Sequence, residues 1–154
     1  MYCQIRQQHG PDRELLEQSI KGELSPQSHV ISYETKSGLV VFGLDNYSDI
    51  NVEISVTGVG RWARRAIFQH FFHYLFNELQ VKRASALVHP DNEKCIKLIT
   101  QLGFVHECSL RGIDVDLFSL LPTDTNYYEF TKTKVKDSEA RADSRAGQRA
   151  MAAE

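Results

Sequence analysis

Three arginines at the start of a predicted helix are the residues of this chain best suited to bind an anion. Residues 58–79 predict a tight glycine turn followed by a helix, with Arg61, Arg64 and Arg65 in its first turn. Backbone N–H groups are unpaired there and the helix macrodipole is already positive, so cations cost stability. Arginines that break this rule indicate a site for an anion such as phosphate. The alternative is that the three side chains are solvated and point away.

The rest of this stretch predicts how the arginines are positioned. Gly58 and Gly60 would let the backbone of the turn approach a ligand closely. Trp62 is better explained as a packing anchor for the helix start than as a ligand contact. The helix that follows has one bulky apolar face, which a sheet would cover. Its members are Phe68, Phe71, Phe72, Leu75, Phe76 and Leu79.

The predicted helix lies between two predicted strands. Residues 50–57 alternate between apolar and polar side chains, and residues 83–88 form a short apolar run. A strand, a helix and a strand with short joints make a βαβ unit, in which the two strands are parallel. Glu53, Ser55 and Thr57 share the polar face of the first strand.

The flanking segments extend this unit on both sides. Asp12 could cap a first helix with a thin apolar face (Leu15, Leu16 and Ile20, with Ile5 before it), and residues 29–35 and 39–44 predict a hairpin. After the second strand, Asp91 or Asn92 is the expected N-cap of a helix that Gly103 ends. Residues 104–110 and 115–121 predict two antiparallel strands.

This order predicts an α/β fold: a mixed sheet of about six or seven strands with helices on both faces and a central parallel βαβ unit. We divide the chain into an N-terminal helix region (residues 1–28), an α/β core (29–130) and a flexible charged tail (131–154). At 154 residues the chain is long enough for one domain with a substantial core.

Composition excludes several classes of protein. The formal net charge of -2 argues against a dedicated nucleic-acid-binding protein, which is usually strongly basic. No run of apolar residues is long enough to cross a membrane, and the N-terminus has no apolar segment typical of a secretory signal. Three unpatterned cysteines favour reduced thiols. We therefore expect a cytoplasmic protein.

Three segments together resemble a known family. They are the strand, turn and helix INVEISVTGVGRWARRAIF, the segment KRASALVHPDNEKCIKL, and the ending ITQLGFVHECSLRGIDVD. The last two are similar to acyl-CoA N-acetyltransferases of the GNAT superfamily, in which Asn, a helix, Leu-Gly-Phe and a strand with Glu and Arg follow in order. Here these positions are Asn92, residues 102–104, Glu107 and Arg111. The sequence looks closest to the ribosomal-protein N-terminal acetyltransferases and to small phage-encoded acetyltransferase-like proteins.

The resemblance implies a function and a set of site residues. The function is transfer of an acetyl group from acetyl-CoA to a primary amine. The cofactor-binding residues would be Ser55, Val56, Thr57, Gly58, Gly60, Arg61, Arg64, Arg65 and Asn92, with the pantetheine arm along the strand and the pyrophosphate at the helix start. Glu53 is the candidate general base, and Asn92 could contact the cofactor as well as cap its helix. An exposed strand carboxylate is the alternative for Glu53.

Two features leave other functions open. Ile99 occupies the position where many members have a tyrosine that protonates the leaving thiolate, so a catalytically weak coenzyme A-binding or protein-interaction module is the alternative function. His70 and His73 share a helix face but lack the further ligands of a zinc site, so we predict no metal. The acceptor amine, a small molecule or part of a protein, is not indicated. The C-terminal strand could pair across a homodimer.

Overall fold

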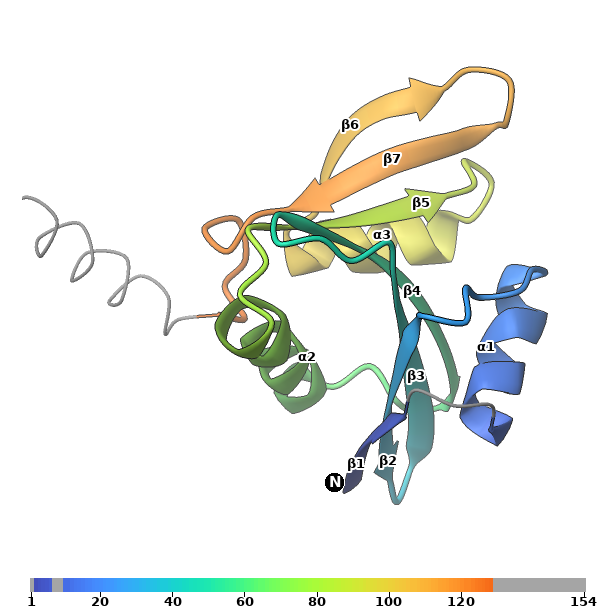
Figure 1. Cartoon of the computed structure of the whole chain (residues 1–154), viewed down its shortest axis with the longest axis vertical. Helices are drawn as coiled ribbons and strands as arrows, with labels where there is room; N and C mark the ends of the chain where they lie inside the picture. The colour runs from blue at the N-terminus through green and yellow to red at the C-terminus, as the bar shows by residue number, and fades with distance from the viewer. Residues whose placement is uncertain (1, 7–9, 129–154) are drawn as a thin grey trace, which may run out of the picture.

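A computed structural model describes residues 2–6 and 10–128 of the chain (Figure 1). The strands are β1 (Tyr2–Arg6), β2 (His29–Thr35), β3 (Gly38–Asp45), β4 (Asn51–Gly60), β5 (Arg83–Val88), β6 (Val105–Leu110) and β7 (Val115–Leu120). The helices are α1 (Pro11–Ile20), α2 (Arg65–His73), the π-helix η1 (Tyr74–Glu78) that continues it, and α3 (Glu93–Leu102). No helix in the described residues is long and apolar enough to cross a membrane.

The strands form one sheet in the order β1-β2-β3-β4-β5-β7-β6. Neighbouring strands are antiparallel except β4 and β5, which are parallel and joined through α2. The sheet has seven strands, within the predicted number, and the predicted central βαβ unit is confirmed.

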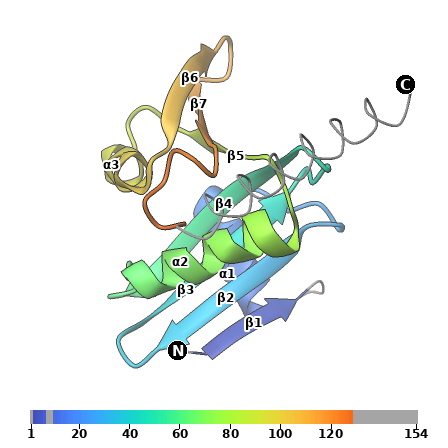
Figure 2. The ribbon, with the colours of Figure 1, turned by 90° about the vertical axis from the view of Figure 1, so that its left-hand side faces the viewer.

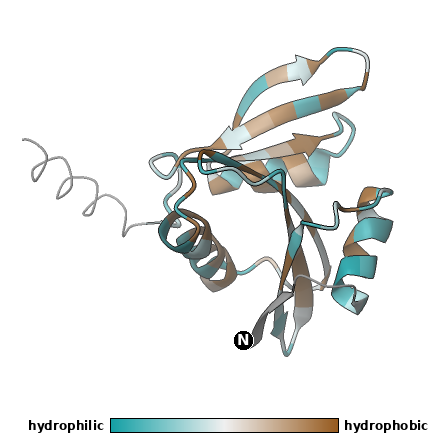
Figure 3. Ribbon diagram, in the orientation of Figure 1, coloured by the Kyte–Doolittle hydropathy of each residue, from teal (hydrophilic) through white to brown (hydrophobic). Residues whose placement is uncertain are grey.

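Helices cover both faces of the sheet, as predicted. α1 lies on one side of β2–β4 and α2 on the other (Figures 1 and 2). α1 is mainly hydrophilic (Figure 3), and its fully buried Leu16 packs in a small cluster with Leu24, Val30 and Val41. The thin apolar face expected of this helix is therefore sufficient to hold it on the sheet.

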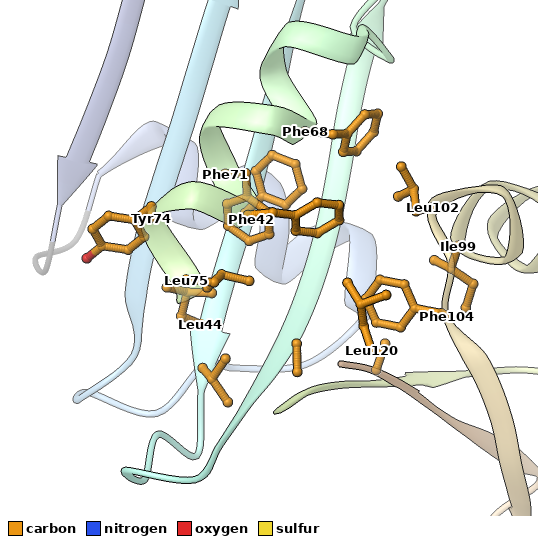
Figure 4. Packing of buried hydrophobic residues seen from close by; sticks show 14 of the residues in the cluster. Phe42, Leu44, Phe68, Phe71, Tyr74, Leu75, Ile99, Leu102, Phe104 and Leu120 are labelled. Atoms are coloured by element: carbon orange, nitrogen blue, oxygen red, sulfur yellow. The ribbon is translucent and has the colours of Figure 1, made fainter. Parts of the chain in front are cut away.

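The main core lies on the opposite face, where α2 and α3 meet the sheet. The ring of Phe42 on β3 stacks on that of Phe71 on α2, with 3.9 Å between the ring centroids. From α3, Ile99 and Leu102 join the same cluster (Figure 4). All predicted apolar residues of the central helix are buried or partly buried against this core, which confirms the predicted face.

Three predicted boundaries are wrong. Residues 2–6 form β1, an edge strand paired with β2, so Ile5 precedes α1 as part of the sheet. β4 continues to Gly60 because β3 pairs with it through that residue, so the predicted glycine turn is the end of a strand. α2 consequently begins at Arg65. The predicted tail, residues 131–154, lies outside the described residues.

A polar cluster ties β6 to the centre of the sheet across β7. Arg83 on β5 donates to Glu107 on β6 (2.7 Å) and to Asn51 on β4 (2.8 Å), while the Ser119 hydroxyl on β7 donates to the other oxygen of Glu107. The hydrogen bond from Arg83, followed by that from Ser119, lowers the pKa of the Glu107 carboxyl. Glu107 therefore stabilises the fold in its ionised form.

We expect the stabilisation by Glu107 to disappear in acid. Since the pKa is lowered in the folded state, the contribution is complete above the ordinary pKa of a glutamate and is lost as pH falls through the lowered value. Between about pH 6 and about pH 3, the free energy of unfolding measured with urea should fall more for the wild type than for Glu107→Gln. Glu23→Gln, in an exposed loop, should behave like the wild type. Equal losses in the wild type and Glu107→Gln would contradict this role.

Candidate functional site

The two parallel strands of the sheet separate after a short paired stretch. β4 and β5 pair only at Asn51 with Arg83, Val52 with Ala84 and Glu53 with Ser85. Beyond these pairs β5 turns away from β4, which remains paired with β3 as far as Gly60 (Figure 1). Alternate residues of a strand direct their N–H and C=O groups to opposite sides. β4 therefore presents unpaired backbone groups to the space between the two strands.

A cavity of about 350 Å³ lies at this split. It is lined on the α2 and α3 side by apolar side chains, among them Phe68, Phe72, Ile99 and Leu102. Figure 4 shows Phe68, Ile99 and Leu102 around the space between the two helices. Ser19 and Ile20, at the end of α1 on the other face of the sheet, also belong to the lining. The cavity thus reaches residues from both faces of the sheet through the split.

Few polar side chains line the cavity. They are Ser19, Ser55, His89, Asn92 and Cys95. Asn92 is the N-cap of α3, as predicted, and its side-chain oxygen accepts a hydrogen bond from the Cys95 N–H (3.2 Å). Burial raises the pKa of the Cys95 thiol, so this group keeps its proton at neutral pH. Asn92 therefore caps a helix and faces the cavity at the same time.

Of the predicted cofactor residues on β4, some line the cavity and the others lie further along the strand. Ser55 and Val56 line the cavity, together with Ile54, which the sequence analysis did not single out. Thr57 is the next residue of the same strand, opposite Val41 of β3. The alternation predicted for residues 50–57 holds for Val52, Ile54 and Val56, which pack in the main core, whereas Ile50 precedes β4 and is exposed.

The three arginines lie at the start of α2, but only one belongs to the helix. Arg65 is its first residue, Arg64 is the N-cap, and Arg61 follows β4. Arg64 donates to the Ser37 hydroxyl (2.7 Å), and the Arg65 guanidinium lies 4.8 Å from the centre of the Tyr127 ring. Within the described residues, Arg61 has no side-chain hydrogen bond, and none of the three has a carboxylate partner.

The backbone at this helix start is also open. No side chain caps α2 and its first turn has no acidic residue. Ile67 and Phe68 donate to the Arg64 carbonyl, but no described residue accepts from the N–H groups of Arg65 and Ala66. The structure therefore combines two unpaired N–H groups with three arginines that lack carboxylate partners, which is an arrangement suited to an anion.

Besides any role in binding a ligand, Gly58 and Gly60 are needed for packing. A Cβ atom at Gly58 would lie 2.2 Å from Nε1 of Trp62, so the indole covers this glycine. The Trp62 ring also contacts Phe68 edge-on, as the predicted packing anchor would. Gly60 has a φ of 75°, and a Cβ atom there would lie 2.5 Å from the Ser37 carbonyl oxygen. Both glycines fix the route of the chain from β4 to α2.

We expect Gly58→Ala to displace the Trp62 ring and to destabilise the protein. Overpacking of this kind costs roughly 1–3 kcal/mol, which a urea titration followed by tryptophan fluorescence would measure. Gly22→Ala is the matched control, since a Cβ atom there comes no closer than 4.0 Å to the Ile20 carbonyl oxygen. Equal stability of the Gly58 and Gly22 variants would show that Trp62 is not held by this contact.

Glu53 occupies the last paired position before the split. It lies opposite Ser85 of β5, and Asn46 donates a hydrogen bond to its carboxylate (3.3 Å). Its side chain is partly buried and does not line the cavity. The general-base role of Glu53 stays a prediction.

The histidines of the described chain do not gather into a metal site. His70 hydrogen-bonds to the Tyr33 hydroxyl (2.9 Å), and His73 to the side chain of Asn77 (2.9 Å). No group of three or more His, Cys, Asp or Glu side chains in the described residues is placed to hold a metal ion. His89 is an ionisable cavity residue that the sequence analysis missed. Its position after a parallel strand, at the carboxyl edge where ligands of α/β sheets bind, is the signal that could have found it.

Comparison with solved structures identifies the fold. The N-acetyltransferase PseH of Campylobacter jejuni is 14% identical over 77% of this chain and 97% of PseH, with a TM-score of 0.55. Its complex with acetyl coenzyme A matches 78% of this chain and 99% of PseH at the same identity and TM-score, 14% and 0.55. A point mutant of the spermidine N-acetyltransferase SpeG from Vibrio cholerae is 19% identical over 77% of this chain and 75% of that protein, with a TM-score of 0.54.

The chain therefore has the GNAT-like α/β fold that the sequence predicted. No protein-family model and no curated protein sequence matches it. The closer resemblance to ribosomal-protein or phage acetyltransferases stays a prediction, because the identities to the solved structures are low.

Proposed function

We propose that this protein transfers an acetyl group from acetyl-CoA to a primary amine. The observation that carries the proposal is the split between β4 and β5, with a cavity reaching through the sheet close to the open start of α2. An extended arm with amide groups and a polyanionic end is the kind of ligand that such a combination fits. The PseH complex with acetyl coenzyme A supports this choice, since PseH has the same fold.

The residues present fit the parts of coenzyme A. The unpaired backbone groups of β4, around Ser55, Val56 and Thr57, can bond the amides of the pantetheine arm as an added strand would. The apolar lining from α2 and α3 suits the arm's methylene groups, and about 350 Å³ lies within the usual range of small-molecule sites. The open N–H groups of Arg65 and Ala66, with Arg61 and Arg64 beside them, suit the pyrophosphate.

Transfer to an amine needs a base and a stabilised oxyanion. We assign the base to Glu53, which lies on β4 immediately before the split, and the oxyanion donor to a backbone N–H near Val56 or Thr57. Asn92 lines the cavity and can contact the cofactor from the start of α3. The acceptor amine would approach from the face of the sheet that carries α1, where Ser19 and Ile20 reach the cavity.

Acetyl-CoA should bind the 154-residue protein in isothermal titration calorimetry. Arg61→Ala should weaken binding about three- to tenfold with a smaller salt dependence. Arg61 is the cleanest variant because its side chain has no hydrogen bond to lose within the described residues, whereas Arg64 also holds Ser37.

The matched control for this experiment is Arg111→Ala, in the turn between β6 and β7, which should bind like the wild type. Absence of binding at about millimolar acetyl-CoA would overturn the proposed function. Equal loss of affinity in the Arg61 and Arg111 variants would remove the start of α2 from the phosphate site.

Replacing Glu53 tests the assignment of the base. Glu53→Gln keeps the side-chain shape but cannot accept a proton, so kcat should fall about a hundredfold, at the low end of general-base effects. The rate would be measured with acetyl-CoA and a panel of primary amines. Asp45→Asn, at the position opposite Glu53 on β3, is the control and should leave kcat nearly unchanged. An unaltered rate in Glu53→Gln would exclude this residue from proton transfer.

A binding module without catalysis is the alternative, and Ile99 in the cavity wall is the feature that motivates it. Tight binding of acetyl-CoA without transfer to any amine of the panel would favour that alternative.

A further inference from the structure

His89 lies at the mouth of the cavity, where β5 ends. It directly follows Val88, the last residue of β5, and its side chain is 54% exposed while still lining the cavity. Among the lining side chains of the described residues, only His89 and Cys95 can exchange a proton at ordinary pH. Cys95 is partly buried and burial raises the pKa of its thiol, whereas the His89 imidazole reaches solvent at the mouth, so His89 is the lining group that can pass a proton between the cavity and water.

Two carboxylates lie near this imidazole, those of Asp91 and Asp116. Nδ1 of His89 is 3.2 Å from the backbone N–H of Asp91 and 3.7 Å from the Asp91 carboxylate. Asp116, opposite Val88 on β7, is close enough for the charge of His89 to act on it, and it also lies 3.6 Å from His106 of β6. With its proton on Nε2, the neutral ring accepts the Asp91 N–H at Nδ1. When Nδ1 carries a proton, as in the protonated ring and in the tautomer left after loss of the Nε2 proton, that proton faces the Asp91 carboxylate instead.

Apart from Cys95, the cavity-lining residues of α2 and α3 in the described chain carry no ionisable group. Ile99 and Leu102 of α3, and Phe68 and Phe72 of α2, are apolar and almost fully buried. A group that leaves the reaction as an anion inside this cavity would therefore find a solvent-connected proton donor at the end of β5, in His89. This argument concerns the same site as the proposed function and depends on it.

We propose that His89 is the catalytic acid that protonates the departing thiolate of coenzyme A. The amine nitrogen forms a bond to the carbonyl carbon and loses a proton to the base, and the carbon–sulfur bond breaks with its electron pair on sulfur. The imidazolium of His89 gives its Nε2 proton to that sulfur, leaving a thiol and a neutral ring. Because His89 is half exposed, the ring regains a proton from water before the next turnover.

The test compares His89→Gln with His106→Gln. Both replace a half-exposed histidine near Asp116, but His106 does not line the cavity. With acetyl-CoA and the same panel of amines, His89→Gln should lower kcat about a hundredfold while the Kd of acetyl-CoA stays within about twofold. His106→Gln should retain the wild-type kcat. Since the active form of His89 is protonated, wild-type kcat should fall with rising pH, and His89→Gln should lack that fall.

Chemical rescue provides a second readout. Free imidazole can enter the exposed mouth in His89→Ala, so it should restore part of the lost rate there and should not accelerate the wild type. Wild-type turnover in His89→Gln would overturn the role of His89 and leave the proposed function intact. Equal losses in the two glutamine variants would also overturn it, because a role shared with His106 is not proton transfer in the cavity. Absence of turnover in the wild type would overturn both proposals.

Discussion

The separation of β4 from β5 is the constraint on which the rest of the site depends. Three residue pairs join the strands, and each strand is then held by its other neighbour, β4 by β3 and β5 by β7. Unpaired backbone groups that are buried cost free energy comparable to a lost hydrogen bond, so an edge opened in the middle of a sheet needs partners. Water or a ligand with its own amides can supply them. The unpaired backbone groups of β4 therefore need the space of the cavity for their hydrogen-bond partners, and the side chains determine its shape.

The start of α2 is held in place beside this opening by aromatic packing. Phe71 stacks on Phe42 of β3, and Phe68 lies between the rings of Trp62 and Tyr127. Tyr127 and the buried Tyr128 belong to the segment after β7, so the end of the described chain packs on the helix that follows β4. These ring contacts fix the position of the start of α2 relative to the split. None of them involves the unpaired N–H groups of Arg65 and Ala66.

Periodicity predicted the elements better than it predicted the site. β2, β5 and the N-cap Asn92 follow from local patterns, because alternation, an apolar run and a capping residue are properties of neighbouring residues. The extent of β4 depends on pairing with β3, and the glycines at its end were interpreted as a turn because glycine permits both structures. The cavity depends on where the pairing of β4 and β5 stops, which no local pattern records. His89 therefore becomes a candidate only after the strands are placed.

The charge distribution explains why the start of α2 is suited to an anion. The full sequence has a formal net charge of -2, so acidic side chains are available to neutralise an arginine cluster. None of the described carboxylates pairs with Arg61, Arg64 or Arg65, and the partners present are a hydroxyl, a carbonyl and an aromatic ring. These contacts orient the guanidinium groups without cancelling their charge. With the helix dipole adding to it, the positive potential is left for a ligand. Placed beside the split, that potential favours a ligand with phosphates at one end and an uncharged arm at the other.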